Sequence, residues 1–79
     1  MERKSILKNL EEVFADVFDL EDVQLNEKTT AEDIEEWDSL SHVLMVVAVE
    51  KKFRIRFTSH EIISWENVGQ MMDSIEKML

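Results

Sequence analysis

The sequence predicts an all-α fold, a small bundle of three main helices and one short helix in up-down order, with a long loop between the first two main helices. Apolar residues recur at spacings of three and four in several segments, which is the periodicity of amphipathic helices. There is no proline and only one glycine, so few tight turns are available for a many-stranded sheet. At 79 residues we expect one domain spanning residues 1–79, with a modest core and no large enclosed active site.

The first helix is predicted by a single apolar stripe near the N-terminus. Its members are Ile6, Leu7, Leu10, Val13, Phe14, Val17 and Phe18. Charged residues occupy the opposite face, so we expect this helix to pack on one side only.

Residues 19–38 are predicted to form a long acidic loop. A few apolar residues anchor it, namely Leu20, Val23, Leu25 and Ile34. Thr30 to Asp33 can cap a short helical turn. The window from Asp19 to Thr30 fails as a calcium-binding EF-hand loop, because Gln24 occupies the glycine position and Thr30 replaces the terminal glutamate. We therefore predict no dedicated metal site.

The second helix is expected from Ser39 to Phe53 and has too many apolar residues for one stripe. One set, assigned to the core, comprises Met45, Val46, Val49 and Phe53. A second set, displaced around the helix and beginning beside Ser39, comprises Leu40, Val43, Leu44 and Val47. A domain this small cannot easily bury both sets. Either the second set is exposed as an apolar contact strip, or the acidic loop folds over it.

The remaining chain is predicted to hold an extended connection and two helices. Residues 53–57 alternate like a strand but have no partner strand, so we expect their apolar members to dock on the bundle. Thr58 and Glu61 form a capping box for a short helix with Ile62 and Ile63 facing inward.

Ser64 is the predicted cap of the last helix. The expected core stripe of this helix is Trp65, Val68, Met72, Ile75 and Leu79, flanked by Met71 and Met78. Gly69 costs about 1 kcal/mol relative to alanine inside a helix, which is tolerable where it permits close packing.

The charge of the chain is strongly acidic and unevenly distributed. The net charge is -9, and between Glu11 and Asp38 there are twelve acidic residues against the single Lys28. Nucleic acid would be repelled by this surface, whereas partners with basic patches would be attracted. A solvated, solubilising surface is the alternative reading of the acidic run.

Composition also bounds the chemistry and the location. The absence of cysteine excludes disulfides and thiolate sites. With no recognisable signal peptide and no long apolar run, we expect a cytoplasmic monomer without membrane insertion.

Ser39 lies at the border between the acidic loop and the apolar helix. It could cap the helix, but Asp38 can do so equally well. In that case Ser39 falls in the first turn, with its hydroxyl facing solvent near backbone N–H groups that favour an attached phosphate. His42 lies three residues after Ser39, but the sequence indicates no acid that would orient it and no oxyanion hole. We therefore predict no catalytic residues. We interpret His42 and His60 as surface histidines.

The stretch Trp37-Asp38-Ser39-Leu40, followed by an apolar helix running to Phe53, resembles the acyl carrier protein family, and the resemblance spans nearly the whole chain. It implies that Ser39 receives 4'-phosphopantetheine covalently from coenzyme A, and that the thiol of this arm carries acyl groups as thioesters. Asp38 and Leu40 would assist recognition at this cofactor site. The resemblance also implies an acyl carrier protein-like bundle whose second helix is read by partners, here through Glu36, Leu40, Val43, Leu44 and Val47.

The chain departs from many fatty-acid carriers at Ser41, Leu44 and Lys51, where those proteins have acidic residues, and at Arg54, where family members often have glycine. The departures at Ser41, Leu44 and Lys51 indicate a dedicated partner set, and the departure at Arg54 indicates a differently shaped helix end. The predicted function is an acyl carrier in a fatty-acid, polyketide or other specialised lipid pathway. Its partners would be a phosphopantetheinyl transferase (holo-ACP synthase) and acyl-loading and acyl-transfer enzymes with basic surface patches. The alternatives are an aminoacyl (D-alanyl or peptidyl) carrier and an unmodified acidic helical adaptor.

Overall fold

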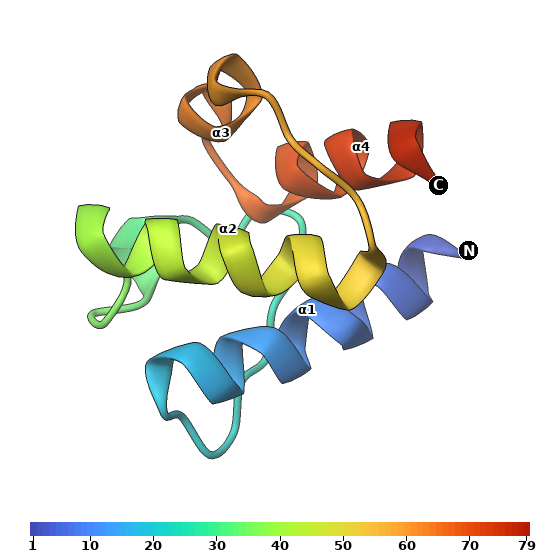
Figure 1. The fold of residues 1–79 in the computed structure, drawn as a ribbon. Coiled ribbons are helices and arrows are strands. Elements are labelled where there is room, and N and C mark those ends of the chain that lie inside the picture. The colour runs from blue at the N-terminus through green and yellow to red at the C-terminus, as the bar shows by residue number, and fades with distance from the viewer.

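The computed structural model describes residues 1–79, and all its regular elements are helices, as predicted (Figure 1). The elements in chain order are α1 (Arg3–Phe18), the 3-10 helix η1 (Ala31–Asp33), α2 (Ser39–Phe53), α3 (Ser59–Ser64) and α4 (Val68–Met78). Helix α1 packs against both α2 and α4, and the short α3 stands apart at one side (Figure 1). No helix combines the length and apolar character that crossing a bilayer requires.

Helix α1 buries the stripe that its sequence predicts. Ile6, Leu10 and Phe14 are fully buried, and Leu7 and Val17 lie half-buried at the edges of the stripe. The helix ends at Asp19, whose backbone is left-handed with φ 54°, and the Asp19 N–H donates to the carbonyl of Ala15. The core therefore begins on one face of α1 and excludes its charged face.

The loop between α1 and α2 is held by the anchors that its sequence indicates. Leu25 is buried, while Leu20, Val23 and Ile34 are half-buried against the core. Thr30 caps η1 by accepting from the Glu32 N–H, and the Asp33 carboxylate accepts from the Thr30 N–H at 2.9 Å, which confirms the predicted turn. Unlike these residues, Trp37 has a structural role that the sequence reading missed. It is buried edge-to-face against Phe14, with 5.1 Å between the ring centroids.

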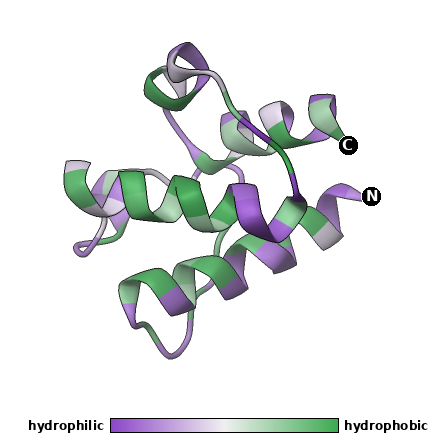
Figure 2. Cartoon of the chain, in the orientation of Figure 1, coloured by the Kyte–Doolittle hydropathy of each residue, from purple (hydrophilic) through white to green (hydrophobic).

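Helix α2 has two apolar faces, and only one is in the core. Met45, Val46, Val49 and Phe53 are buried, as predicted. The second set remains exposed, with Leu40 at 75%, Val43 at 57%, Leu44 at 58% and Val47 at 45%. The acidic loop does not cover them, and Figure 2 shows α2 as hydrophobic over most of its length. We call these four residues the α2 strip.

The C-terminal part of the chain departs from the prediction in two places. Ile62 is half-buried, but Ile63 is 81% exposed, because neighbours on a helix point about 100° apart and α3 has only one inward side. Ser64 ends α3 instead of capping α4. The cap is Asn67, whose side chain accepts from the Gln70 N–H.

The stripe of α4 is consequently shorter than expected at both ends. Trp65 precedes the helix and is half-buried, with its indole N–H donating to the Ser74 hydroxyl at 2.8 Å. Leu79 follows the helix and is exposed, whereas Met71 is fully buried and belongs to the core.

Several contacts join α4 to the N-terminal half of the chain, among them those of Gly69 and Arg3. The Gly69 N–H donates to the carbonyl of Glu27 at 2.8 Å, so the glycine permits the close approach that its position suggested. Arg3 bonds to the carboxylates of Glu27, Asp73 and Glu76, and these contacts raise the pKa of the guanidinium. The loop, the first turn of α1 and α4 thus meet around Arg3 and Glu27.

We expect Gly69→Ala to destabilise the domain even though alanine is the better helix former. A Cβ at this position would lie 2.9 Å from the Glu27 carbonyl oxygen, so the backbone would have to move. The expected loss is about 1 to 3 kcal/mol in the free energy of unfolding, measured by urea titration. Lys77→Ala, at an exposed site in the same helix, should change it by less than about 0.5 kcal/mol. A more stable Gly69→Ala variant would contradict the assigned packing.

Candidate functional site

The start of α2 is fixed by a reciprocal hydrogen-bonded cap. The Asp38 carboxylate accepts from the N–H groups of Leu40 at 3.1 Å and Ser41 at 2.9 Å, and the Ser41 hydroxyl accepts from the Asp38 N–H at 2.8 Å. Asp38 is therefore the cap, and Ser39 is the first residue of the helix. Of the two arrangements open at the sequence level, this one leaves the Ser39 side chain outside the capping bonds.

The two serines of this turn differ in availability. The Ser41 hydroxyl also donates to the carbonyl of Glu36 at 2.8 Å, so both its donor and its acceptor functions are used within the chain. Ser39 is exposed, and its hydroxyl makes no hydrogen bond in the structure. Ser39 is thus the serine that an external reactant can reach.

The same cap defines the electrostatics around Ser39. The hydrogen bond from the Ser41 backbone N–H is the largest cause that lowers the pKa of the Asp38 carboxyl below its usual value. Asp38 therefore keeps its negative charge beside Ser39. Because Asp38 already occupies the Leu40 and Ser41 N–H groups, a phosphate on Ser39 would not find those two donors free.

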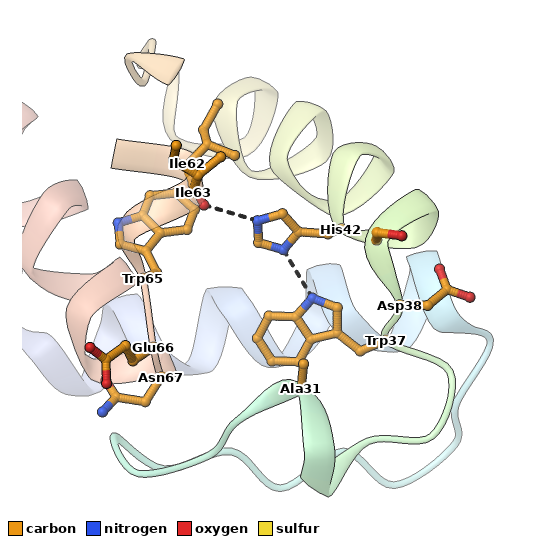
Figure 3. A pocket seen from close by; sticks show the side chains of 10 residues that line it. Ala31, Trp37, Asp38, His42, Ile62, Ile63, Trp65, Glu66 and Asn67 are labelled. Carbon is orange, nitrogen blue, oxygen red and sulfur yellow. Dashed lines mark hydrogen bonds between the residues drawn. The ribbon is translucent and has the colours of Figure 1, made fainter. Parts of the chain in front are cut away.

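His42 is not the plain surface histidine predicted from the sequence. Its Nδ1 accepts from the Trp37 indole N–H at 3.0 Å, and its Nε2 lies 3.2 Å from the Ile62 carbonyl (Figure 3). An indole N–H only donates and a carbonyl only accepts, so these partners assign a neutral imidazole with its proton on Nε2. The ring is half-buried and links the loop, α2 and α3. It has no free nitrogen to serve as a base for Ser39, whereas His60 is exposed as predicted.

A pocket of about 450 Å³ opens beside Ser39. It lies between the start of α2, η1, α3 and the connection to α4, and Figure 3 shows its side chains converging from these segments. The lining residues are Ala31, Trp37, Asp38, Ser39, His42, Ile62, Ile63, Trp65, Glu66 and Asn67. Two indole rings give it broad apolar walls beside polar side chains, so it suits a flexible group with both apolar and amide parts.

The structure gathers the sequence-predicted site residues around the start of α2. Asp38, Ser39 and Leu40 are consecutive and exposed, and Glu36 is exposed just before them. The remaining α2 strip runs on from Leu40 along the helix. Sequence reasoning missed the pocket walls formed by Ile62 and Trp65, because these residues reach Ser39 only through the fold. Among the large apolar side chains that line the pocket, only Trp37 could be associated with Ser39 from sequence, because it lies in the stretch that ends at Leu40.

The chain was compared with known proteins at the level of sequence and of structure. No protein-family model matches it, and no curated protein matches it significantly. Among solved structures, it is similar to the solution NMR structure of the holo acyl carrier protein from Geobacter metallireducens, with a TM-score of 0.85 and 38% sequence identity. The match covers 91% of this chain and 83% of that one.

The Asp38 cap predicts a specific pH dependence of stability. A carboxyl whose pKa is lowered by folding stabilises the native state above its unfolded pKa, and this contribution is lost as the pH falls through the folded pKa. Asp38→Asn keeps a capping oxygen but cannot ionise. We expect the parent's advantage in Tm over this variant to be largest near about pH 7 and to narrow towards about pH 2.

Thermal unfolding across this pH range measures the effect. The matched control is Glu35→Gln, which removes an exposed carboxylate that makes no hydrogen bond in the structure and should show no comparable narrowing. An advantage over Asp38→Asn that stays constant with pH would refute the assigned cap.

Proposed function

Because the chain belongs to the acyl carrier protein family, and is a carrier protein rather than an enzyme, we propose that it carries acyl groups as thioesters on a 4'-phosphopantetheine arm attached to Ser39. The observation that carries this proposal is the free Ser39 hydroxyl, exposed at the first turn of α2 while Ser41 is fully engaged. The arm supplies the reactive thiol. The chain supplies its attachment point and its recognition surface.

The attachment step requires no catalytic group from this chain. The Ser39 oxygen forms a bond to the phosphorus that carries pantetheine in coenzyme A, the bond from that phosphorus to the adenosine bisphosphate breaks, and the serine proton passes to the transferase. Within the chain, Asp38 holds its charge beside the reacting oxygen, and His42 is committed to Trp37 and Ile62. The activating base therefore belongs to the separate transferase.

The pocket beside Ser39 gives the arm a place to rest. Its indole walls and the Ile62 side chain offer apolar contact, and its polar side chains offer hydrogen bonds to amides. We infer that the arm and the first atoms of its cargo lie against this pocket when no partner holds them. Met45 and Met72 are among the buried core residues, and methionine side chains repack readily.

The surface around Ser39 supports a dedicated set of partner enzymes. Exposed acids precede α2 at Glu32, Asp33, Glu35, Glu36 and Asp38. They favour a transferase and acyl-transfer enzymes with basic patches, which would contact Leu40 and Val43 of the α2 strip. Since Ser41, Leu44 and Lys51 differ from many fatty-acid carriers, we assign the chain to a specialised lipid or polyketide pathway in the cytoplasm, acting as a monomer.

An unmodified adaptor is the second candidate, because the α2 strip is an exposed apolar surface that a partner could cover without any cofactor. In that case the Ser39 hydroxyl would be dispensable. The two proposals therefore differ in what they predict for modification at Ser39.

We expect the purified apo protein, incubated with coenzyme A, magnesium and a broadly specific phosphopantetheinyl transferase, to gain the mass of one phosphopantetheine. Ser39→Ala should gain nothing. Ser41→Ala is the matched control, and it should still be modified because Ser39 remains exposed in it. Intact-mass spectrometry reads all three. No gain on the folded parent with several transferases would favour the adaptor, and a gain on Ser39→Ala would place the site elsewhere.

A further inference from the structure

The charge of the chain reverses at the far end of α2. Four of its nine basic residues lie within residues 51–56, and no acid occurs between Glu50 and Glu61. Lys51, Arg54 and Arg56 are exposed and form no ion pair or side-chain hydrogen bond, whereas Lys52 lies 3.6 Å from Glu12 of α1. This end of the acidic domain is therefore locally basic, although Lys51 also borders a hollow with Glu12 and Asp16 of α1.

This basic end is continuous with the α2 strip. Val47, the last residue of the strip, shares an open hollow of about 310 Å³ with Lys51 and Arg56. Glu50 also lines the hollow, and its carboxylate accepts from the Phe57 N–H at 2.8 Å, so two basic side chains and one acidic side chain border the hollow. Figure 2 shows mostly hydrophobic residues along α2, followed by a hydrophilic segment near its C-terminal end.

A single partner can cover the strip and both charged ends. From Ser39 to Lys51 the helix rises about 18 Å, at roughly 1.5 Å per residue. A typical interface buries about 800 Å² on each partner, and the whole domain exposes 5446 Å² with a longest extent of 28 Å. An interface centred on Leu44 would have an apolar middle, with acidic residues on the side of Ser39 and basic residues on the side of Lys51.

We propose that the transferase that modifies Ser39 docks along the whole of α2 and places acidic side chains in the hollow between Lys51 and Arg56. This inference rests on the proposed function. The transferase is the partner whose position is most constrained, because it must reach the Ser39 oxygen itself. Its basic patch meets the acids before α2, and its acidic patch meets the bases after it. Docking in the reverse direction would juxtapose like charges, so the surface fixes orientation as well as affinity.

The test is the kinetics of modification by the transferase of the same organism, with coenzyme A and magnesium. We compare the parent with the double variant Lys51→Glu/Arg56→Glu and with the control Lys4→Glu/Lys8→Glu. The control makes the same change in net charge at exposed residues of α1 that form no ion pairs in the structure. Circular dichroism and Tm establish that all three are folded.

At about 50 mM salt we expect the Lys51→Glu/Arg56→Glu variant to lose roughly tenfold in kcat/KM, mainly through KM, and the control to stay within about twofold of the parent. At about 500 mM salt the gap should fall to roughly twofold, because exposed charges are screened. Equal effects in both variants, no effect, or faster modification of the Lys51→Glu/Arg56→Glu variant would overturn the docking inference alone. Failure to modify the parent would remove the proposed function, and this inference with it.

Discussion

The hydrogen-bonded cap between Asp38 and Ser41 is the constraint on which the functional end of this molecule depends. It sets the first residue of α2, and so decides which serine is engaged and which is free. Were Asp38 unable to cap, Ser39 would be the next candidate to accept from the helix N–H groups, and its hydroxyl would be drawn into the backbone. The bond from Ser41 to the Glu36 carbonyl ties the preceding loop to the same turn.

Aromatic side chains connect that turn to the core. Trp37 directly precedes the cap and packs edge-to-face on Phe14 of α1, while its indole N–H is held by His42 one turn into α2. His42 in turn reaches the Ile62 carbonyl of α3, and Trp65 packs on Phe57 with 4.7 Å between the ring centroids. The pocket beside Ser39 is thus walled by groups that also fix how α3 is placed.

The sequence was sufficient for features encoded by local periodicity and local caps. The helical stripes, the Asp38 and Thr58 caps and the bounds of α2 all rest on residues within one or two turns of each other. The predicted start of α4 was wrong because Ser64 and Asn67 are both good caps, and local sequence does not choose between them. The role of His42 was missed because its partner Ile62 is brought near only by the fold.

The placement of the tryptophans has a practical consequence. The chain has two tryptophans and no tyrosine, and both indoles line the pocket beside Ser39. The tryptophan fluorescence of the protein therefore originates entirely from the walls of that pocket. Whatever lies in it, whether solvent, the arm or a cargo, sets the environment of both emitters. If the arm and its cargo rest against this pocket as proposed, tryptophan fluorescence would report their arrival without an introduced label.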